Sequence, residues 1–237
     1  MIHTIRSVTS TASTNDDVAA LARAGEAEGF WLRAETQTGG RGRHGRAWQS
    51  PPGNLFASTI IRQRIGDPPP ATLAMVAALA LHQVAAAYGD ASRITLKWPN
   101  DLMLDGAKLS GILLEAVGDA IVIGFGVNLA HRPEGLDRAT ASFAAAGLGA
   151  PDPAAFLEDL AQAFTYWVGR WRGEGLSTIR REWLLRAHAI GTPLRTTGAD
   201  GQSVEGLFEG LDENGALRLR LADGTIHILH AGDVFLI

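Results

Sequence analysis

Residues 35–48 read Glu35-Thr36-Gln37-Thr38-Gly39-Gly40-Arg41-Gly42-Arg43-His44-Gly45-Arg46-Ala47-Trp48. Positions 39–46 hold three arginines and four glycines, and positions 36–66 contain no Asp or Glu. The whole chain has a formal net charge of -4, so this stretch is a basic island in an acidic molecule. Glycines let a ligand come close to the backbone, and arginines present planar hydrogen-bonding forks. We therefore expect residues 39–48, called the arginine loop below, to hold an anionic small molecule.

The glycine spacing of the arginine loop also fits two phosphate-binding motifs. Gly40-x-Gly42-x-x-Gly45 matches the dinucleotide fingerprint, and Gly40 and Gly45 are spaced as in a Walker loop. Both motifs place the phosphate on a helix that starts directly afterwards. Residues 47–53 include two prolines and a glycine and cannot start a helix, so we reject both interpretations. A solvated Arg-Gly loop that contacts RNA is the plain alternative.

The composition predicts a folded protein with one large core and a small second domain. The chain has 237 residues, of which 46% are hydrophobic and 19% charged. It contains no cysteine, which excludes disulfides, thiol catalysis and cysteine-ligated zinc. The N-terminal residues lack the apolar region of a secretion signal, and we expect a cytoplasmic protein. The apolar segment Thr72–Tyr88 contains His82 and Gln83, which favours a buried helix over a membrane span.

Hydrophobic periodicity and turn residues predict an alternation of strands and helices up to residue 189. The predicted strands are 3–8, 30–36, 54–61, 94–98, 108–115 and 120–129. The predicted helices are 14–24, a helix from the prolines at 68–70 to Tyr88, 153–172 and 176–189. Residues 130–153 are predicted to form a long irregular loop. The tryptophans at 167, 171 and 183 are expected in the core or an interface.

The pattern changes at Gly191 to short strands with turns at 198–201, 212–215 and 223–224. Such a tail is typical of a small β-barrel. His227 and His230 would lie on opposite faces of one strand, which makes them a poor metal pair. No other metal-ligand spacing is visible in the sequence.

Lysine occurs at only two positions, Lys97 and Lys108, among 21 basic residues. This bias suggests two sites that need a compact point charge, although chance is the alternative. Lys97 precedes a Trp98-Pro99-Asn100-Asp101 turn, which also fits an ordinary Asn-Asp turn. Glycines inside strands mark a close approach to the backbone. We expect glycines of the strands 108–115 and 120–129 to form a floor beside Lys108.

Together these segments resemble the biotin protein ligase family, over essentially the whole chain. The matching segments are Ser13-Thr14-Asn15, Gln37 with 40–48, 97–101, 108–113, 124–128, 133–134 and 139–142, in that order. The resemblance implies an α+β fold with a mixed sheet flanked by helices, of the class II aminoacyl-tRNA-synthetase-like type. It implies a catalytic domain at 1–189 and an SH3-like β-barrel at 190–237. The motif at Ser13 comes within fifteen residues of the start, so we expect a single-function ligase without the DNA-binding domain of many bacterial members.

The resemblance also implies a reaction in two steps. The biotin carboxylate attacks the α-phosphate of MgATP, which yields biotinyl-5′-AMP and pyrophosphate. A lysine of a biotin carboxyl carrier domain then attacks the acyl carbon. We expect Lys108 at the carboxylate–phosphate junction and Arg43 to keep the intermediate from water. Asp101 either accepts the proton of the carrier lysine or serves as an ion-pair partner.

The site residues implied by the resemblance fall into three groups. Those expected to bind biotin are Ser13, Thr14, Gln37, Gly40, Arg41, Arg43, Trp48, Lys108, Gly111, Gly124 and Gly126. Those expected to bind the nucleotide are Arg41, Arg43, Arg46, Trp48, Asn100, Lys108 and Asn128. Those expected to act in catalysis are Lys108, Arg43, Asp101 and Lys97, and no metal ligand is expected among the side chains.

Three alternatives stay open at this stage. A lipoate ligase or lipoyl/octanoyl transferase shares the architecture, and competition by lipoate would reveal it. A nucleic-acid-binding module would use the basic island, although the net charge of -4 opposes it. An inactive scaffold would bind carrier proteins without ATP turnover. We expect a monomer or a homodimer, with biotin, ATP and a carrier domain as partners, and neither DNA nor a membrane.

Overall fold

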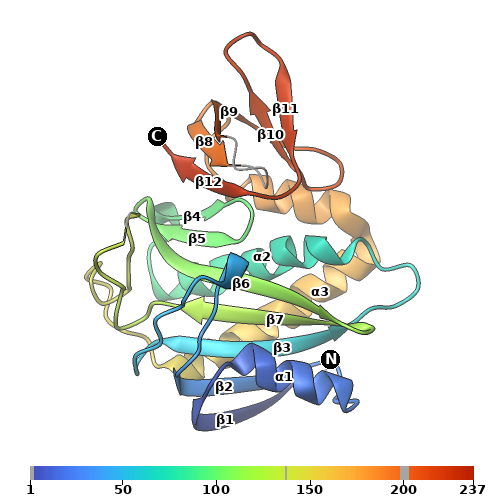
Figure 1. Cartoon of the computed structure of the whole chain (residues 1–237), viewed down its shortest axis with the longest axis vertical. Helices are drawn as coiled ribbons and strands as arrows, with labels where there is room; N and C mark the ends of the chain where they lie inside the picture. The colour runs from blue at the N-terminus through green and yellow to red at the C-terminus, as the bar shows by residue number, and fades with distance from the viewer. Residues whose placement is uncertain (1–2, 137, 198–202) are drawn as a thin grey trace.

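The computed structural model describes residues 3–136, 138–197 and 203–237. A seven-stranded sheet forms the larger part, with strand order β1-β2-β3-β7-β6-β5-β4 (Figure 1). β1 pairs with β2 in parallel and the other neighbours are antiparallel, which confirms the predicted mixed sheet. Its strands are β1 (Thr4–Thr11), β2 (Phe30–Gln37), β3 (Leu55–Arg62), β4 (Ile94–Lys97), β5 (Asp101–Leu104), β6 (Ala107–Val117) and β7 (Ala120–Val127).

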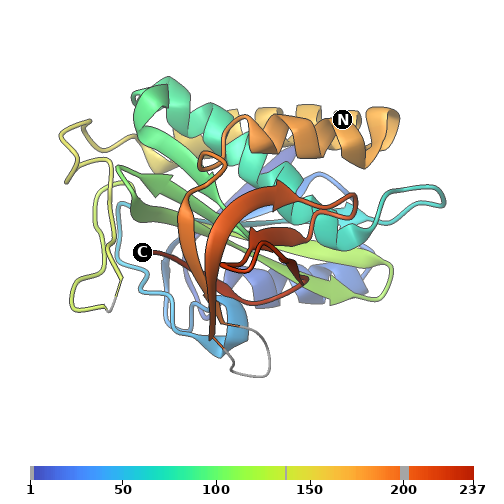
Figure 2. The ribbon, with the colours of Figure 1, turned by 90° about the horizontal axis from the view of Figure 1, so that it is seen from above.

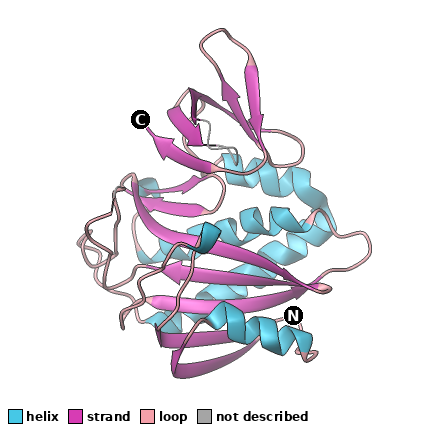
Figure 3. Cartoon of the chain, in the orientation of Figure 1, coloured by secondary structure: helices cyan, strands magenta, loops and turns pink. Residues whose placement is uncertain are grey.

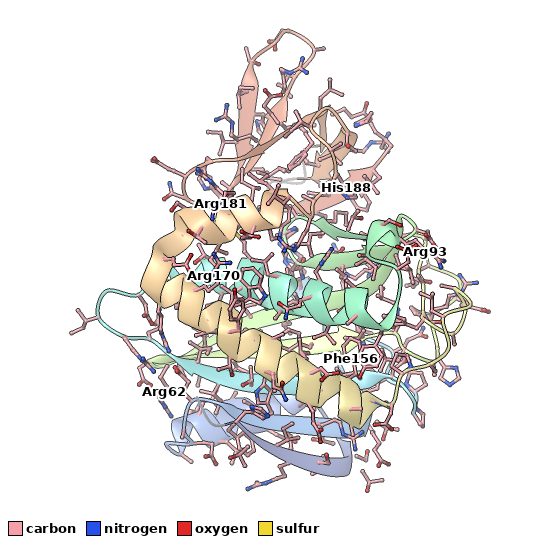
Figure 4. The ribbon with its side chains drawn as sticks, turned by 180° about the vertical axis from the view of Figure 1, so that it is seen from behind. Arg62, Arg93, Phe156, Arg170, Arg181 and His188 are labelled. Atoms are coloured by element: carbon pink, nitrogen blue, oxygen red, sulfur yellow. The ribbon has the colours of Figure 1, made fainter. Side chains whose placement is uncertain are left out.

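Helices cover both faces of this sheet, as Figure 3 shows. α1 packs its buried Val18, Ala19 and Ala22 on β2, β3 and β7 on one face. α2 and α3 cover the other face, which Figure 4 shows from behind. The helices are α1 (Thr14–Arg23), α2 (Leu73–Tyr88) and α3 (Pro153–Leu184), with single 3-10 turns η1 (Arg43–Gly45), η2 (Pro70–Thr72) and η3 (Ala91–Arg93). Because β3 is covered on both sides, seven of its eight residues are buried.

α2 is the central helix of the core. The segment Pro70–Tyr88 is long and apolar enough to cross a membrane by length and composition, with a mean hydropathy of 1.5. It nevertheless packs against both the sheet and α3, and 67% of that window is buried inside the protein. The prediction of a buried core helix is therefore confirmed. The tryptophans at 167, 171 and 183 are at most 3% exposed, so their predicted core role is confirmed as well.

α3 differs from its prediction at its C-terminal end. The two predicted helices are separated by a kink at Gly175, whose φ of 76° is not helical. The second helix ends at Leu184 and not at residue 189. Beyond it the chain runs along the edge of β4, where Leu96 N donates to Arg186 O at 2.8 Å and Ala187 bridges Leu96. Residues 186–187 leave the helix because they cover an otherwise open sheet edge.

β5 was not predicted as a strand. The sequence pattern indicated only a turn at Asn100-Asp101, but Asp101–Leu104 pairs with both β4 and β6. All four residues of β5 are buried, which removes the alternation that marks a half-exposed strand. The Trp98-Pro99 peptide bond before it is cis.

The C-terminal residues form a five-stranded antiparallel sheet with the order β11-β10-β9-β8-β12. Figure 2 shows this sheet from above, lying over the rest of the molecule. Its strands are β8 (Pro193–Thr197), β9 (Ser203–Leu211), β10 (Leu217–Arg220), β11 (Ile226–Leu229) and β12 (Asp233–Leu236). The predicted turns at 212–215 and 223–224 are confirmed, whereas the turn predicted at 198–201 lies outside the described residues. The domain limits 1–189 and 190–237 stay a prediction.

Candidate active site

A cavity of about 320 Å³ lies where the arginine loop, the strands β6 and β7, and the C-terminal strand β12 meet. It collects almost all the predicted site residues from segments far apart in the sequence. Those that line it are Ser13, Thr14, Gln37, Arg41, Arg43, Arg46, Trp48, Lys97, Asn100, Asp101, Lys108, Gly111, Gly124 and Gly126. Gly40 and Asn128 are not in the lining.

The arginine loop closes on itself and leads into extended chain. Gly42 N donates to Arg46 O at 2.7 Å, and the single turn η1 contains His44 at φ 57° and Gly45 at φ 70°. Arg46 is again extended, so no helix follows and the rejection of both phosphate motifs is confirmed. A Cβ on Gly40 would lie 2.8 Å from Ser50 Oγ and from Trp48 O. Gly40 thus fits the tight base of the loop and does not face the cavity.

Each arginine of the loop is held by a different acceptor. Arg41 makes a two-pronged ion pair with Asp16, at 2.5 and 2.7 Å. Arg43 donates to Gly232 O at 3.1 Å and to Asn100 Oδ1 at 3.4 Å. Its burial lowers the pKa of the guanidinium, which stays protonated because arginine titrates far above neutral pH.

Arg46, the third arginine, pairs with Asp233 of β12. Burial raises the pKa of the Asp233 carboxyl, but the hydrogen bond and charge of Arg46 outweigh it and hold the pKa below its ordinary value. Asp233 was not predicted as a site residue. It lies in the C-terminal sheet, 187 positions from Arg46.

Of the glycines predicted to form a floor, Gly111 lies beside Lys108, and Trp48 packs on Gly111 and Gly126. A Cβ on Gly126 would come within 2.5 Å of the Trp48 ring, and one on Gly111 within 3.2 Å. A Cβ on Gly124 would instead collide with the Asn15 amide. The glycines are thus needed because two side chains pack directly on the strands. Lys108 Nζ lies 5.8 Å from the centroid of the Trp48 ring.

The opposite end of the cavity carries neutral hydrogen-bonding groups. Gln37 Oε1 accepts from Thr14 N at 2.9 Å and from Thr14 Oγ1 at 3.2 Å, and Thr14 Oγ1 also bonds Ser58 Oγ. Ser13 is the N-cap residue of α1, but its side chain makes no capping hydrogen bond. Capping alone therefore does not explain Ser13, which is buried against the cavity. Ser58 was missed by the sequence prediction, because a buried serine in an apolar strand carries no local signal.

The two lysines of the chain converge on one carboxylate. Asp101 pairs with Lys108 and, at 3.0 Å, with Lys97. Asp101 is 6% exposed and Lys108 9%. Burial raises the pKa of the Asp101 carboxyl, but the charges of both lysines outweigh it and the pKa lies below its ordinary value. Burial lowers the pKa of the Lys108 ammonium, against the opposing charge of Asp101. Buried charges require such pairing, so the cluster is a fixed cationic centre.

Comparisons with known proteins show which family the chain belongs to. The model of the biotin/lipoate A/B protein ligase family matches residues 8–128, and that of the biotin protein ligase C-terminal domain matches residues 190–237. The biotin–[acetyl-CoA-carboxylase] ligase of Paracoccus denitrificans is 39% identical over 236 residues, covering 95% of this chain and 97% of that protein. The corresponding Mycobacterium tuberculosis ligase is 34% identical over 235 residues, covering 96% and 86%. The bifunctional ligase/repressor BirA of Bacillus subtilis is 31% identical over 231 residues, covering 92% of this chain and 70% of BirA.

Solved structures agree on the fold. The Aquifex aeolicus biotin protein ligase in complex with biotin and ATP superposes with a TM-score of 0.87 at 20% identity, covering 100% of both chains. The chain belongs to the biotin/lipoate A/B protein ligase family. Since its C-terminal part also matches the biotin protein ligase C-terminal domain and its relatives are biotin–[acetyl-CoA-carboxylase] ligases, it falls among the biotin protein ligases within that family. The resemblance inferred from the motifs is thereby confirmed.

Proposed function

We propose that this protein activates biotin with ATP to biotinyl-5′-AMP and transfers the biotinyl group to a lysine of a biotin carboxyl carrier domain. The observation that carries the proposal is a single cavity with two chemically different ends. One end offers neutral hydrogen-bonding groups and an aromatic wall, and the other offers Arg43, Arg46, Lys97 and Lys108. The first end suits a neutral bicyclic ligand with an apolar chain. The second suits a polyphosphate.

At the neutral end, Ser13, Thr14 and Gln37 would hydrogen-bond the ureido ring of biotin. Trp48 would pack against its apolar body, over the floor made by Gly111, Gly124 and Gly126. Arg41 points to Asp16 and lies 3.6 Å from Glu115, so we assign it to holding the loop over this end. Gly40 contributes by shaping the base of the same loop.

Lys108 would stabilise the charge that grows when the biotin carboxylate attacks the α-phosphate. It lies between the aromatic wall and Asp101, where the two ends of the cavity meet. Fixed charges in a buried site stabilise such a transition state without reorganisation. The lowered pKa of Asp101 makes it a weak base, which supports the role of ion-pair partner over that of proton acceptor.

The phosphates would lie along Arg43, Arg46, Asn100 and Lys97. Asn100 is held in place because its Nδ2 donates to Ile112 O at 2.6 Å. Asn128 donates to Ala141 O at 3.0 Å, outside the cavity lining, and its part in nucleotide binding stays a prediction. In the second step the amine of the carrier lysine attacks the acyl carbon and AMP leaves. Arg43, half-buried beside Gly232, would keep the intermediate in place until then.

Mg²⁺ is expected as the counter-ion of ATP. Among the residues that the structure describes, no group of three or more His, Asp or Glu could hold a metal. The carboxylate of Asp101 is already engaged by two lysines. Mg²⁺ ordinarily binds substrate phosphates with few protein ligands. In the proposed reaction the ion would neutralise phosphate charge. We place the reaction in the cytoplasm.

Transfer of biotin to a carrier tests the proposal. The purified protein is incubated with MgATP, biotin and a biotin carboxyl carrier domain, and the mass of the carrier is measured. We expect a gain of one biotinyl group that requires both ATP and biotin. A parallel reaction with lipoate separates the lipoyl alternative, since a lipoyl gain without a biotinyl gain would contradict the proposal. Carrier binding without any gain would instead indicate a scaffold.

A further inference from the structure

Three consecutive residues of the C-terminal domain contact the cationic end of the cavity. Arg43 donates to Gly232 O at 3.1 Å, Arg46 pairs with Asp233, and Lys97 donates to Val234 O at 2.8 Å. Figure 1 shows β12 beside β4, the strand that ends with Lys97, whereas Arg43 and Arg46 come from the arginine loop. The C-terminal sheet is thus a wall of the phosphate end of the cavity.

Asp233 is the charged member of this wall. The contacts from residues 232 and 234 are made by backbone carbonyls and involve no side chain of these two residues. The Asp233 side chain is 23% exposed and forms its ion pair with Arg46. The negatively charged Asp233 side chain therefore lies in the part of the site that attracts a polyanion.

A carboxylate and a phosphate compete for the same donors of a guanidinium. Both bind its planar N–H fork in the same way. The Arg46 side chain is 50% exposed and pairs with Asp233, so a phosphate must displace or share that carboxylate. A like charge several ångströms from a polyphosphate also weakens its binding.

We propose that Asp233 is an internal competitor for the nucleotide on Arg46, through which the C-terminal domain weakens the binding of ATP and speeds the loss of pyrophosphate. The proposal rests on the function proposed above, which places phosphates at Arg46. No covalent bond changes: the guanidinium exchanges one anionic partner for another. After adenylate formation, Asp233 returns to Arg46 as pyrophosphate leaves.

The test measures binding of an ATP analogue with a methylene bridge between the α- and β-phosphates, by calorimetry at saturating biotin. Asp233→Asn removes the charge and keeps the shape. We expect the analogue to bind about 3- to 10-fold more tightly. Product inhibition by pyrophosphate should strengthen by a similar factor, while biotin affinity stays unchanged. Asp233→Glu keeps the negative charge and should bind the analogue with the affinity of the unmodified protein. The control is Glu209→Gln, which removes a carboxylate paired with Arg220 in the same domain.

Opposite results overturn the proposal. Weaker binding of the analogue by Asp233→Asn would mean that Asp233 positions Arg46 for the phosphates. Unchanged binding would mean that the ion pair has no effect on nucleotide binding. Asp233→Ser serves as a second uncharged variant if the thermal midpoint of Asp233→Asn falls, and the same readouts apply to it. Failure of the unmodified protein to bind the analogue at all would contradict the proposed function itself, which keeps the two failures apart.

Discussion

The two ends of the cavity are held in different ways. At the neutral end, Thr14, Gln37 and Ser58 hydrogen-bond one another, and Thr14 and Ser58 are buried. At the cationic end, Arg46 is half exposed and pairs with a carboxylate from another part of the chain. A hydrogen-bonded buried network stays in place when a ligand enters. The ion pair of the exposed Arg46, in contrast, must be broken before Arg46 can contact a ligand. We infer that the neutral end is preformed and the cationic end is completed by its ligand.

Removing the fixed charge at the junction should have the largest effect. We expect Lys108→Ala to lower the rate of adenylate formation about 100- to 1,000-fold. This is the usual loss of rate when a group that stabilises a developing charge is removed. The fold should survive, because Asp101 keeps Lys97 as a partner. Pyrophosphate release reports the rate, and the thermal midpoint reports the fold. Near-normal release would remove Lys108 from the reaction.

A methyl group added at Gly126, beneath Trp48, should weaken biotin binding at the neutral end of the cavity without affecting the cationic end. A Cβ at position 126 would meet the Trp48 ring at 2.5 Å, so Gly126→Ala must displace the indole. We expect biotin affinity to fall about 10-fold or more, corresponding to about 1.4 kcal/mol or more. Gly169→Ala is the matched control, because nothing lies within 4 Å of its added Cβ. Equal biotin binding by both variants would refute the packing argument.

Arg43→Ala should open the cationic end after the first step. Its guanidinium bridges Gly232 and Asn100, so its loss removes a link between the domains over the phosphate region. We expect biotinyl-AMP to dissociate about 3- to 10-fold faster, as for the loss of one hydrogen bond worth about 1 kcal/mol. Release of labelled intermediate into solution measures it. An unchanged dissociation rate would count against this role.

The ion pair between Arg41 and Asp16 should matter least. Both side chains are well exposed, so we expect Asp16→Asn to change the free energy of unfolding by less than about 1 kcal/mol. The hydrogen bond from Arg41 lowers the pKa of Asp16. The pair therefore stabilises the fold above the ordinary pKa of a carboxyl, and this contribution disappears as the pH falls through the lowered pKa. Acid unfolding of the two proteins should converge at low pH, and a persistent gap would contradict this assignment.

The same contrast explains what the sequence could predict. Ser13, Gln37, the arginine loop and Lys108 belong to short motifs, and the resemblance of these motifs to a known family predicted the chemistry. Asp233 belongs to no motif, and its contact with Arg46 spans 187 positions. β5 was missed because all its residues are buried, and the end of α3 was placed too late because residues 186–187 are drawn to the edge of β4. Local patterns predicted the elements, whereas contacts between distant segments required the structure.

The most direct test of this account is formation of the bound intermediate. The protein is mixed with biotin and MgATP without a carrier, and its intact mass is measured under native conditions. The account predicts one biotinyl-AMP per chain on the unmodified protein and, at the same short mixing time, about one hundredth of that amount or less on Lys108→Ala. A protein that carries no adenylate, or that forms one from lipoate and not from biotin, would contradict it.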